Sequence, residues 1–305
     1  MALGIIFGVA AGALWGFSFI IPFVLPNASS ELISAGRFGV YALVSAFLLL
    51  PQLKSVLKLL NGPRILWLLL LSVTGNSLYY ILMVDAVRLT GVAITSIIVG
   101  ALPVTIAIFG ARSGAELKKF SGPLLLIAFG ITVVQWPMLY DFFTGQAEVS
   151  FKGTLLAFAA HVSWLIFALM NARFLKLNTD ISPKIWSELL GVGSFVTLAF
   201  YIVYRIWTGH IEVYTTGITM QFIALSFVLG CFGSVLGNWF WNEASKRLST
   251  AFVGQLIVSE TIFAIIYECI YLQKTPKIFE MLSLILLALG VIWASKQARP
   301  RKHLN

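Results

Sequence analysis

Long apolar stretches separated by short polar or turn-forming segments dominate this chain. A helix that crosses a hydrocarbon core of about 30 Å needs roughly 20 apolar residues. Segments rich in proline, glycine, asparagine and charge break the pattern, as expected where helices end. The pattern predicts an all-α integral membrane protein with ten transmembrane helices, at residues 3–25, 31–50, 64–87, 91–110, 120–138, 151–172, 184–206, 219–242, 248–269 and 278–296.

Two of the breaks are very short. Only Arg88–Thr90 separates the third and fourth spans, and only Glu243–Arg247 separates the eighth and ninth. Each of these pairs is therefore expected to form a tight antiparallel hairpin. The first span follows no basic segment, so we expect a retained helix and no cleaved signal peptide.

Composition leads to the same class of protein. Hydrophobic residues make up 59% of the 305 residues, charged residues only 11%, and the mean hydropathy is +0.93. A soluble domain has about 45–50% apolar and about 25% charged residues. This composition excludes a soluble enzyme, a disordered chain and a disulfide scaffold. The two cysteines lie in apolar segments, where two buried thiols are expected.

The net charge of +9 has a topological explanation. In a soluble protein such an excess suggests nucleic-acid binding, but cytoplasmic loops of membrane proteins are also rich in Lys and Arg. If the N-terminus is cytoplasmic, 15 of the 21 basic residues fall on the cytoplasmic side and 5 on the outer side. We therefore expect both termini in the cytoplasm, a basic tail at 297–305, and no nucleic-acid partner.

The ten spans divide into two related halves. Ala11–Trp15 aligns with Ala160–Trp164 at an offset of 149, and Asp85–Leu89 aligns with Glu243–Arg247 at an offset of 158. We predict one five-helix repeat at 1–145 and a second at 146–296. Because five is odd, the second repeat enters the membrane from the opposite side. Inverted repeats that rock around a midplane site are typical of secondary transporters.

Several motifs resemble the EamA-type branch of the drug/metabolite transporter superfamily along essentially the whole chain. They are Ala13–Phe19, Ser34–Phe38, Ala86–Gly91, Leu102–Val104, Asn242–Ala251 and Ser259-Glu260. Asn76–Tyr80 and Thr95–Pro103 look most like bacterial aromatic amino-acid exporters. One departure is Thr261, where the family usually has proline after the glutamate, which puts a kink there in doubt. The resemblance implies a central cavity lined by spans 1, 3, 4, 6, 8 and 9, with spans 5 and 10 at the periphery.

Small residues form two helical stripes that allow close approach of backbones. One comprises Gly4, Gly8, Gly12 and Gly16 in the first span, and the other comprises Gly233 and Gly237 in the eighth. Both static packing and a surface that slides during transport fit this spacing.

The embedded charged residues that we single out are Arg37, Glu188 and Glu260. A charge at the midplane costs roughly 2.5–3.5 kcal/mol on insertion scales, so it needs a partner or water. Arg37 fits a structural ion pair with either glutamate, a snorkelling residue, or a ligand for an anionic substrate. Glu260 is the deepest carboxylate, and it fits a coupling-proton site, a ligand for an ammonium group, or a hydrogen bond to a neighbouring helix.

Polar and aromatic side chains share faces of the third and eighth spans at helical spacing. We interpret these faces as cavity walls that suit a medium-sized amphipathic substrate, although an interfacial aromatic belt has a similar composition. Pro103 is expected to kink the fourth span, and His161 fits either packing or a proton relay. The predicted cavity residues are Trp15, Asn76, Tyr79, Tyr80, Met83, Gly100, Pro103, His161, Trp164, Gly237, Asn238, Trp241 and Glu260.

The leading functional hypothesis is secondary transport in a bacterial inner membrane, with export of aromatic or other neutral amino acids. Uptake or exchange of another metabolite, such as a nucleotide-linked compound, is the alternative. No phosphate-binding loop of Walker type is present, so ATP hydrolysis by this chain is not expected. No cofactor or metal site is expected, because His and Cys form no ligand cluster. An intramembrane enzyme needs paired catalytic groups at one depth, which the sequence lacks; a scaffold is a further alternative, and the oligomeric state stays open.

Overall fold

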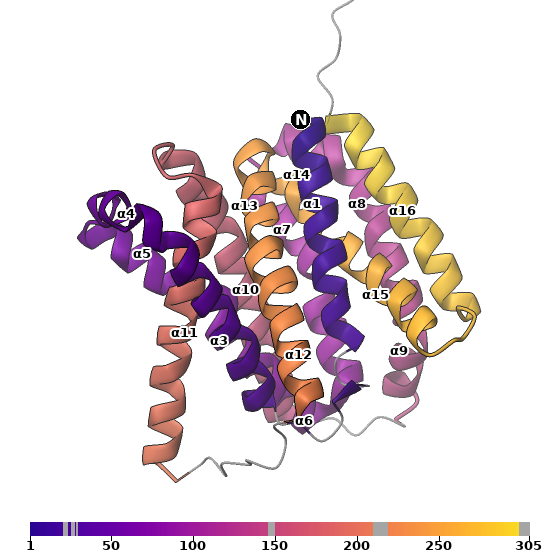
Figure 1. Ribbon diagram of the computed structural model, residues 1–305. Coiled ribbons are helices and arrows are strands. Elements are labelled where there is room, and N and C mark those ends of the chain that lie inside the picture. The colour runs from indigo at the N-terminus through magenta and orange to yellow at the C-terminus, as the bar shows by residue number, and fades with distance from the viewer. Residues whose placement is uncertain (21–23, 26–27, 29, 146–149, 210–218, 299–305) are drawn as a thin grey trace, which may run out of the picture.

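The computed structural model describes residues 1–20, 24, 25, 28, 30–145, 150–209 and 219–298. Within these ranges the regular secondary structure is helical (Figure 1). The last part of the predicted first span (21–23), most of the basic tail (299–305) and the side chain of Arg88 lie outside the described part of the chain.

The all-α prediction is confirmed, and eight helices are long and apolar enough to cross a membrane. They are Leu32–Leu59, Gly62–Val87, Gly114–Val134, Phe151–Leu177, Pro183–Trp207, Met220–Arg247, Thr250–Tyr271 and Ile278–Ala298. The predicted first and fourth spans correspond to two shorter apolar helices, Ala2–Gly16 and Ile94–Gly110, among the described residues. The count of ten spanning helices therefore stays a prediction.

The first half consists of helical segments that end at turn-forming or capping residues. Asn61 caps one helix by accepting a hydrogen bond from the backbone N–H of Arg64, and Ser113 caps another by accepting from Glu116, the role that short polar side chains favour. The segments are α1 (Ala2–Gly16), η1 (Phe17–Ile20), α3 (Ser30–Leu49), η2 (Leu50–Gln52), α4 (Leu53–Leu59), α5 (Gly62–Ser72), η3 (Val73–Ser77), α6 (Leu78–Gly100), α7 (Leu102–Gly110), α8 (Gly114–Val134) and α9 (Trp136–Phe143).

Hydroxyl caps begin most helices of the second half. Ser150, Ser182, Thr219 and Ser249 each accept a hydrogen bond from the backbone N–H three residues later, which satisfies a donor that a helix start leaves free. The segments are α10 (Phe151–Leu177), α11 (Pro183–Trp207), α12 (Met220–Val228), η5 (Leu229–Leu236), α13 (Gly237–Arg247), α14 (Thr250–Leu256), α15 (Val258–Tyr271) and α16 (Ile278–Ala298).

The expected hairpin between spans 3 and 4 lies inside α6, between the apolar helix that ends at Val87 and the one that begins at Ile94. The Thr74 carbonyl accepts from Ser163, and the Ile98 carbonyl bonds His161, so residues 74 and 98 meet neighbouring turns of α10. A straight helix would place those residues about 36 Å apart. The chain therefore reverses direction within α6, near Thr90, which faces Gly153 at the start of α10.

Helix irregularities recur at equivalent places in the two halves. The wide helical turns of η3 span residues 73–77. Adding the offset of 158 gives residues 231–235, which lie inside η5, a second segment with wide turns. Span 4 is interrupted at Ala101, between α6 and α7, and span 9 at Ile257, between α14 and α15, two residues before the position that the offset of 158 gives. Thr261 thus does not prevent the break that its missing proline put in doubt, because the interruption lies one turn earlier.

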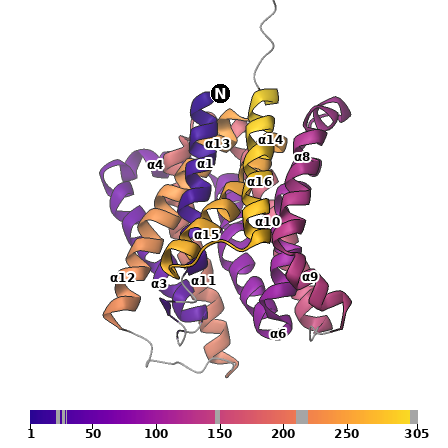
Figure 2. The same ribbon diagram turned by 90° about the vertical axis from the view of Figure 1, so that its right-hand side faces the viewer.

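The first helices of the two halves run in opposite directions. Gly4 of α1 packs against Arg247, and the amine of Lys176, at the end of α10, bonds Thr250 nearby. The start of α1 and the end of α10 therefore lie at one end of the bundle. The end of α16 lies there too (Figures 1 and 2), and we call this end the N-terminal face.

Helices α8 and α16 pack against each other at one edge of the bundle, as Figure 1 shows. Ser283 of α16 donates a hydrogen bond to the Gly130 carbonyl of α8 at 2.9 Å. This arrangement leaves the centre of the bundle to α1, α6, α7, α10, α13 and α15.

Candidate functional site

Three tryptophans from three helices meet in the centre of the bundle. The ring centroids of Trp15 and Trp241 are 5.6 Å apart, those of Trp164 and Trp241 are 5.7 Å apart, and those of Trp15 and Trp164 are 6.2 Å apart. We call this group the tryptophan cluster. Trp15 belongs to the first half and the other two to the second, so the cluster joins the halves. Trp241 is 1% exposed, which places it in the interior and not in an interfacial belt.

Tyr79 extends the aromatic surface toward the reversal in α6. Its ring centroid is 6.3 Å from that of Trp164, which also packs against Phe167 at 5.8 Å. The neighbouring Tyr80 packs edge-on against Phe38 of α3 at 6.1 Å. The two consecutive tyrosines therefore face different neighbours, and Tyr79 is the one beside the tryptophan cluster.

A carbonyl in η5 positions Trp15. Its indole Nε1 donates to the Gly233 carbonyl at 2.8 Å. A Cβ on Gly237 would approach Nε1 of Trp15 to 2.6 Å, so only glycine leaves room for the ring. Gly237 therefore serves the site through the space it leaves, whereas a Cβ on Gly233 would meet nothing closer than 3.8 Å.

Arg37 reaches the same region from α3. Its Nε donates to the hydroxyl of Ser234 at 2.9 Å, and its guanidinium lies 5.7 Å from the centroid of the Phe38 ring. Its charge acts electrostatically on Tyr79 and Glu260. Among the described residues no carboxylate lies within 4.0 Å of Arg37, so the ion pair considered from the sequence is not formed there.

Glu260 occupies the first turn of α15, directly after the interruption at Ile257. Its side chain is partly buried, and the Arg37 guanidinium and Tyr79 lie within its electrostatic range. The backbone that carries it is held against α1. A Cβ on Gly12 would come within 2.8 Å of the Glu260 nitrogen, and one on Gly16 within 2.9 Å of its carbonyl oxygen.

The glycine stripe of α1 thus lies along α14 and α15. A Cβ would meet a neighbour at 3.0 Å from Gly4 and at 2.6 Å from Gly8, closer than packed carbon atoms approach. All four glycines permit the backbone contact that brings Trp15 and Glu260 together.

His161 bridges the interruption in span 4. Its Nδ1 lies 2.8 Å from the Ile98 carbonyl before the break, and its Nε2 lies 3.0 Å from the Thr105 hydroxyl after it. Because a carbonyl only accepts, Nδ1 carries the proton, and Nε2 of a neutral ring is an acceptor that competes with the Leu102 carbonyl for the Thr105 hydroxyl proton. Pro103 is buried in the first turn of α7, so the expected kink is an interruption of the helix.

The remaining predicted residues have varied positions. Asn76 is 7% exposed in η3, and its Nδ2 has no hydrogen-bond partner within the described residues. Asn238 is buried beside the Tyr41 hydroxyl, and Met83 is partly buried on α6. Gly100 faces Gln135, which follows α8, at 2.5 Å from an added Cβ. Gly100 therefore contacts the peripheral helix and not the tryptophan cluster.

Glu188 lies away from this centre. Its nearest cation is the amine of Lys184, one helical turn earlier, at 3.9 Å. The i, i+4 spacing was visible in the sequence and would have indicated this partner in place of Arg37.

Sequence reasoning missed a buried amide network beside the tryptophan cluster. Trp186 donates to the Asn171 side-chain oxygen at 2.8 Å, and Asn171 donates to Asn242 at 2.7 Å. All three side chains are completely buried. Asparagines inside apolar spans are the signal that could have found it, since a buried amide needs partners.

Comparison with known proteins identifies the class. The EamA-like transporter family matches residues 2–136 and 151–296. The chain is 30% identical to "Inner membrane protein YtfF" of Escherichia coli K12, over 100% of this chain and 98% of that protein. It is 24% identical to "Uncharacterized transporter YyaM" of Bacillus subtilis, over about half of each. A solved crystal structure shares the fold, with a TM-score of 0.78 over 98% of both chains at 18% identity.

Proposed function

The chain belongs to the EamA-like transporter family, and from this premise we propose that it moves a small organic metabolite by alternating access. Membership confirms the resemblance read from the motifs and makes the chain a membrane transporter. The finer proposal is export of amino acids, aromatic or otherwise neutral. Uptake or exchange of another metabolite, such as a nucleotide-linked compound, is the alternative.

The observation that carries the substrate proposal is that the tryptophan cluster, Tyr79, Arg37 and Glu260 come from six helices to one region of the interior. Arg37 uses Nε for Ser234, which leaves its other N–H donors for a carboxylate. Glu260 supplies an anion for an ammonium group, and Tyr79 and the indoles supply aromatic faces that attract cations and apolar side chains. A zwitterionic amino acid presents both charges and an apolar side chain at this spacing of groups.

Three features support alternating access. The first helices of the two halves run in opposite directions, spans 4 and 9 are both interrupted, and Gly12 and Gly16 of α1 lie against the backbone of α15. Interrupted helices at the interface of inverted repeats are a common transporter arrangement. Substrate release then requires Trp15 to separate from the two tryptophans of the second half.

The environment of the protein follows from the family and a relative. The strongly apolar helices and the name of the Escherichia coli relative support a multi-pass protein of the inner membrane. From the excess of basic residues near the N-terminal face, we propose that both termini are cytoplasmic.

Flux measurements in proteoliposomes test the function. We expect saturable transport of a radiolabelled aromatic or neutral amino acid by the purified protein. Trp164→Ala should lower this flux by about 30-fold, because a desolvated cation–π contact is worth about 2 kcal/mol and about 1.4 kcal/mol is a factor of ten. Trp207→Ala is the matched control, since this tryptophan is 84% exposed. Equal loss in both variants, or no flux of any amino acid tested, would contradict the amino-acid proposal.

Coupling is tested in the same vesicles with an imposed pH gradient. Glu260→Gln preserves the size of the side chain but cannot exchange a proton. We expect the gradient to accelerate transport by the unsubstituted protein and to leave the variant unaffected. A variant that still responds fully to the gradient would remove Glu260 from the coupling mechanism.

A further inference from the structure

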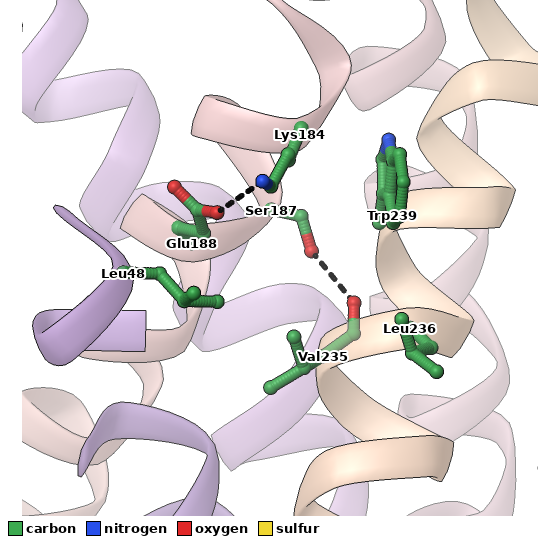
Figure 3. A pocket seen from close by; sticks show the side chains of 7 residues that line it. All are labelled: Leu48, Lys184, Ser187, Glu188, Val235, Leu236 and Trp239. Atoms are coloured by element: carbon green, nitrogen blue, oxygen red, sulfur yellow. Dashed lines mark hydrogen bonds and ion pairs between the residues drawn. The ribbon is translucent and has the colours of Figure 1, made fainter. Parts of the chain in front are cut away.

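A cavity lies toward the N-terminal face, between α3, α11 and the segment that joins η5 to α13. Its volume is about 170 Å³. Figure 3 shows Glu188 and Lys184 on one side and Trp239 on the other. None of the tryptophan-cluster residues lines it, and it is independent of the function proposed above. The lining residues are Leu48, Lys184, Ser187, Glu188, Val235, Leu236 and Trp239.

The carboxylate of Glu188 is the unusual group in this cavity. Its side chain is 2% exposed, and within the described residues neither oxygen has a hydrogen-bond partner. The amine of Lys184, at 3.9 Å, is too distant for a hydrogen bond. An ionised carboxylate accepts about four hydrogen bonds, and burying it without donors is costly. Donors from a bound group would remove that cost.

The other walls define which group fits. Leu48, Val235 and Leu236 are apolar, and the Lys184 amine lies 5.8 Å from the centroid of the Trp239 ring. An anion and an aromatic face together select a cation that carries N–H donors. Lys184 places such a group here already, but its side chain is 50% exposed and can turn toward water.

We propose that this cavity binds a primary ammonium group that carries a short apolar chain. The Glu188 carboxylate accepts its hydrogen bonds, the Trp239 ring covers its charge, and Lys184 is a tethered competitor. The volume suffices for several heavy atoms, because one water needs about 10–15 Å³ on the same measure. The ammonium group belongs either to a free amine or to the headgroup of an aminophospholipid.

Calorimetric titration of the whole protein in phosphatidylglycerol nanodiscs with n-propylammonium chloride tests the proposal. We expect saturable binding that Glu188→Gln weakens by more than about tenfold, since one tenfold step corresponds to 1.4 kcal/mol. Lys184→Met should tighten binding by up to about fivefold, because a partly exposed ion pair is worth at most about 1 kcal/mol. Glu268→Gln, whose carboxylate pairs with Lys274 elsewhere, is the control and should bind like the unsubstituted protein.

Two further measurements distinguish a lipid headgroup from a free amine and test whether the charge of the ligand is required. Weaker apparent binding of n-propylammonium in phosphatidylethanolamine nanodiscs would identify the lipid headgroup as the occupant, and equal binding would identify a free amine. n-Propanol, similar in size but uncharged, should not bind. The proposal is overturned if neither the unsubstituted protein nor Lys184→Met binds n-propylammonium, or if Glu188→Gln binds it equally well.

Discussion

The helices of spans 4 and 9 are both interrupted near their centres, but different side chains stabilise the two interruptions. In span 4, Pro103 lacks a backbone N–H, and the ring of His161 spans the gap from Ile98 to Thr105. In span 9 there is no proline. The Ser259 hydroxyl donates to the Leu256 carbonyl at 2.7 Å, and the Glu260 N–H donates to the Ile257 carbonyl at 2.8 Å.

The break in span 4 is stabilised by a residue far away in the sequence, whereas the break in span 9 is stabilised by residues next to it. The break in span 4 depends on a residue of α10, so a side chain of the second half holds a helix of the first. The break in span 9 satisfies its own carbonyls and needs its neighbour only for shape, since α1 lies against it with glycines. The two halves therefore share a geometry while different sequence positions maintain it.

The largest expected effect comes from filling the contact between α1 and the span 9 break. In Gly12→Leu the new Cβ would meet the Ser259 hydroxyl and the Glu260 backbone. Overpacking costs about 1–3 kcal/mol or more, so the apparent melting temperature in detergent should fall sharply. Gly233→Ala is the control and should melt normally, because its Cβ meets nothing within 3.7 Å. Equal melting of the two variants would show that α1 is free to move away.

A smaller effect is expected from removing the bridge across span 4. His161→Ala removes two hydrogen bonds, one to the Ile98 carbonyl before the break and one to Thr105 after it, at about 0.5–1.5 kcal/mol each. Ser259→Ala removes a single local bond and should cost only about 0.5–1.5 kcal/mol. Thermal unfolding of both variants, measured side by side, checks this order. If Ser259→Ala were more destabilising than His161→Ala, the break in span 9 would depend more strongly on its side-chain hydrogen bond than the break in span 4 does.

The smallest effect is expected from giving span 9 the proline that it lacks. Thr261 is the fourth residue of α15, where proline removes one backbone donor at a cost of about 1 kcal/mol. Because the Ile257 carbonyl already accepts from Glu260, Thr261→Pro should fold and melt close to the unsubstituted protein. A collapse of folded yield would show that the N–H of Thr261 is essential to the break.

Hydropathy predicted the helical segments and their order because it records which residues must avoid water. The offset of 158 found in the sequence also brings η3 onto part of η5, so the wide helical turns of the two halves coincide. The sequence repeat did not predict these turns, but it relates their positions.

Contacts between segments that are distant in the sequence could not be predicted in the same way. Trp241 lies near one end of its span in the sequence, and only the packing of α1 against α13 shows that it is interior. An ion pair with a glutamate was one of the alternatives left open for Arg37, because span depth says nothing about direction around a helix. The placement of Gly100 beneath Gln135 was equally hidden, since it depends on how α8 meets α6.

The tryptophan cluster also gives the protein an optical signature. Indole rings with centroids 5.6–6.2 Å apart share their electronic excitations, and the resulting circular dichroism depends on their mutual angles. Since one ring moves with the first half and two with the second, any rocking of the halves changes the spectrum. The alternating access proposed above would therefore be observable in unlabelled protein, by ultraviolet light alone.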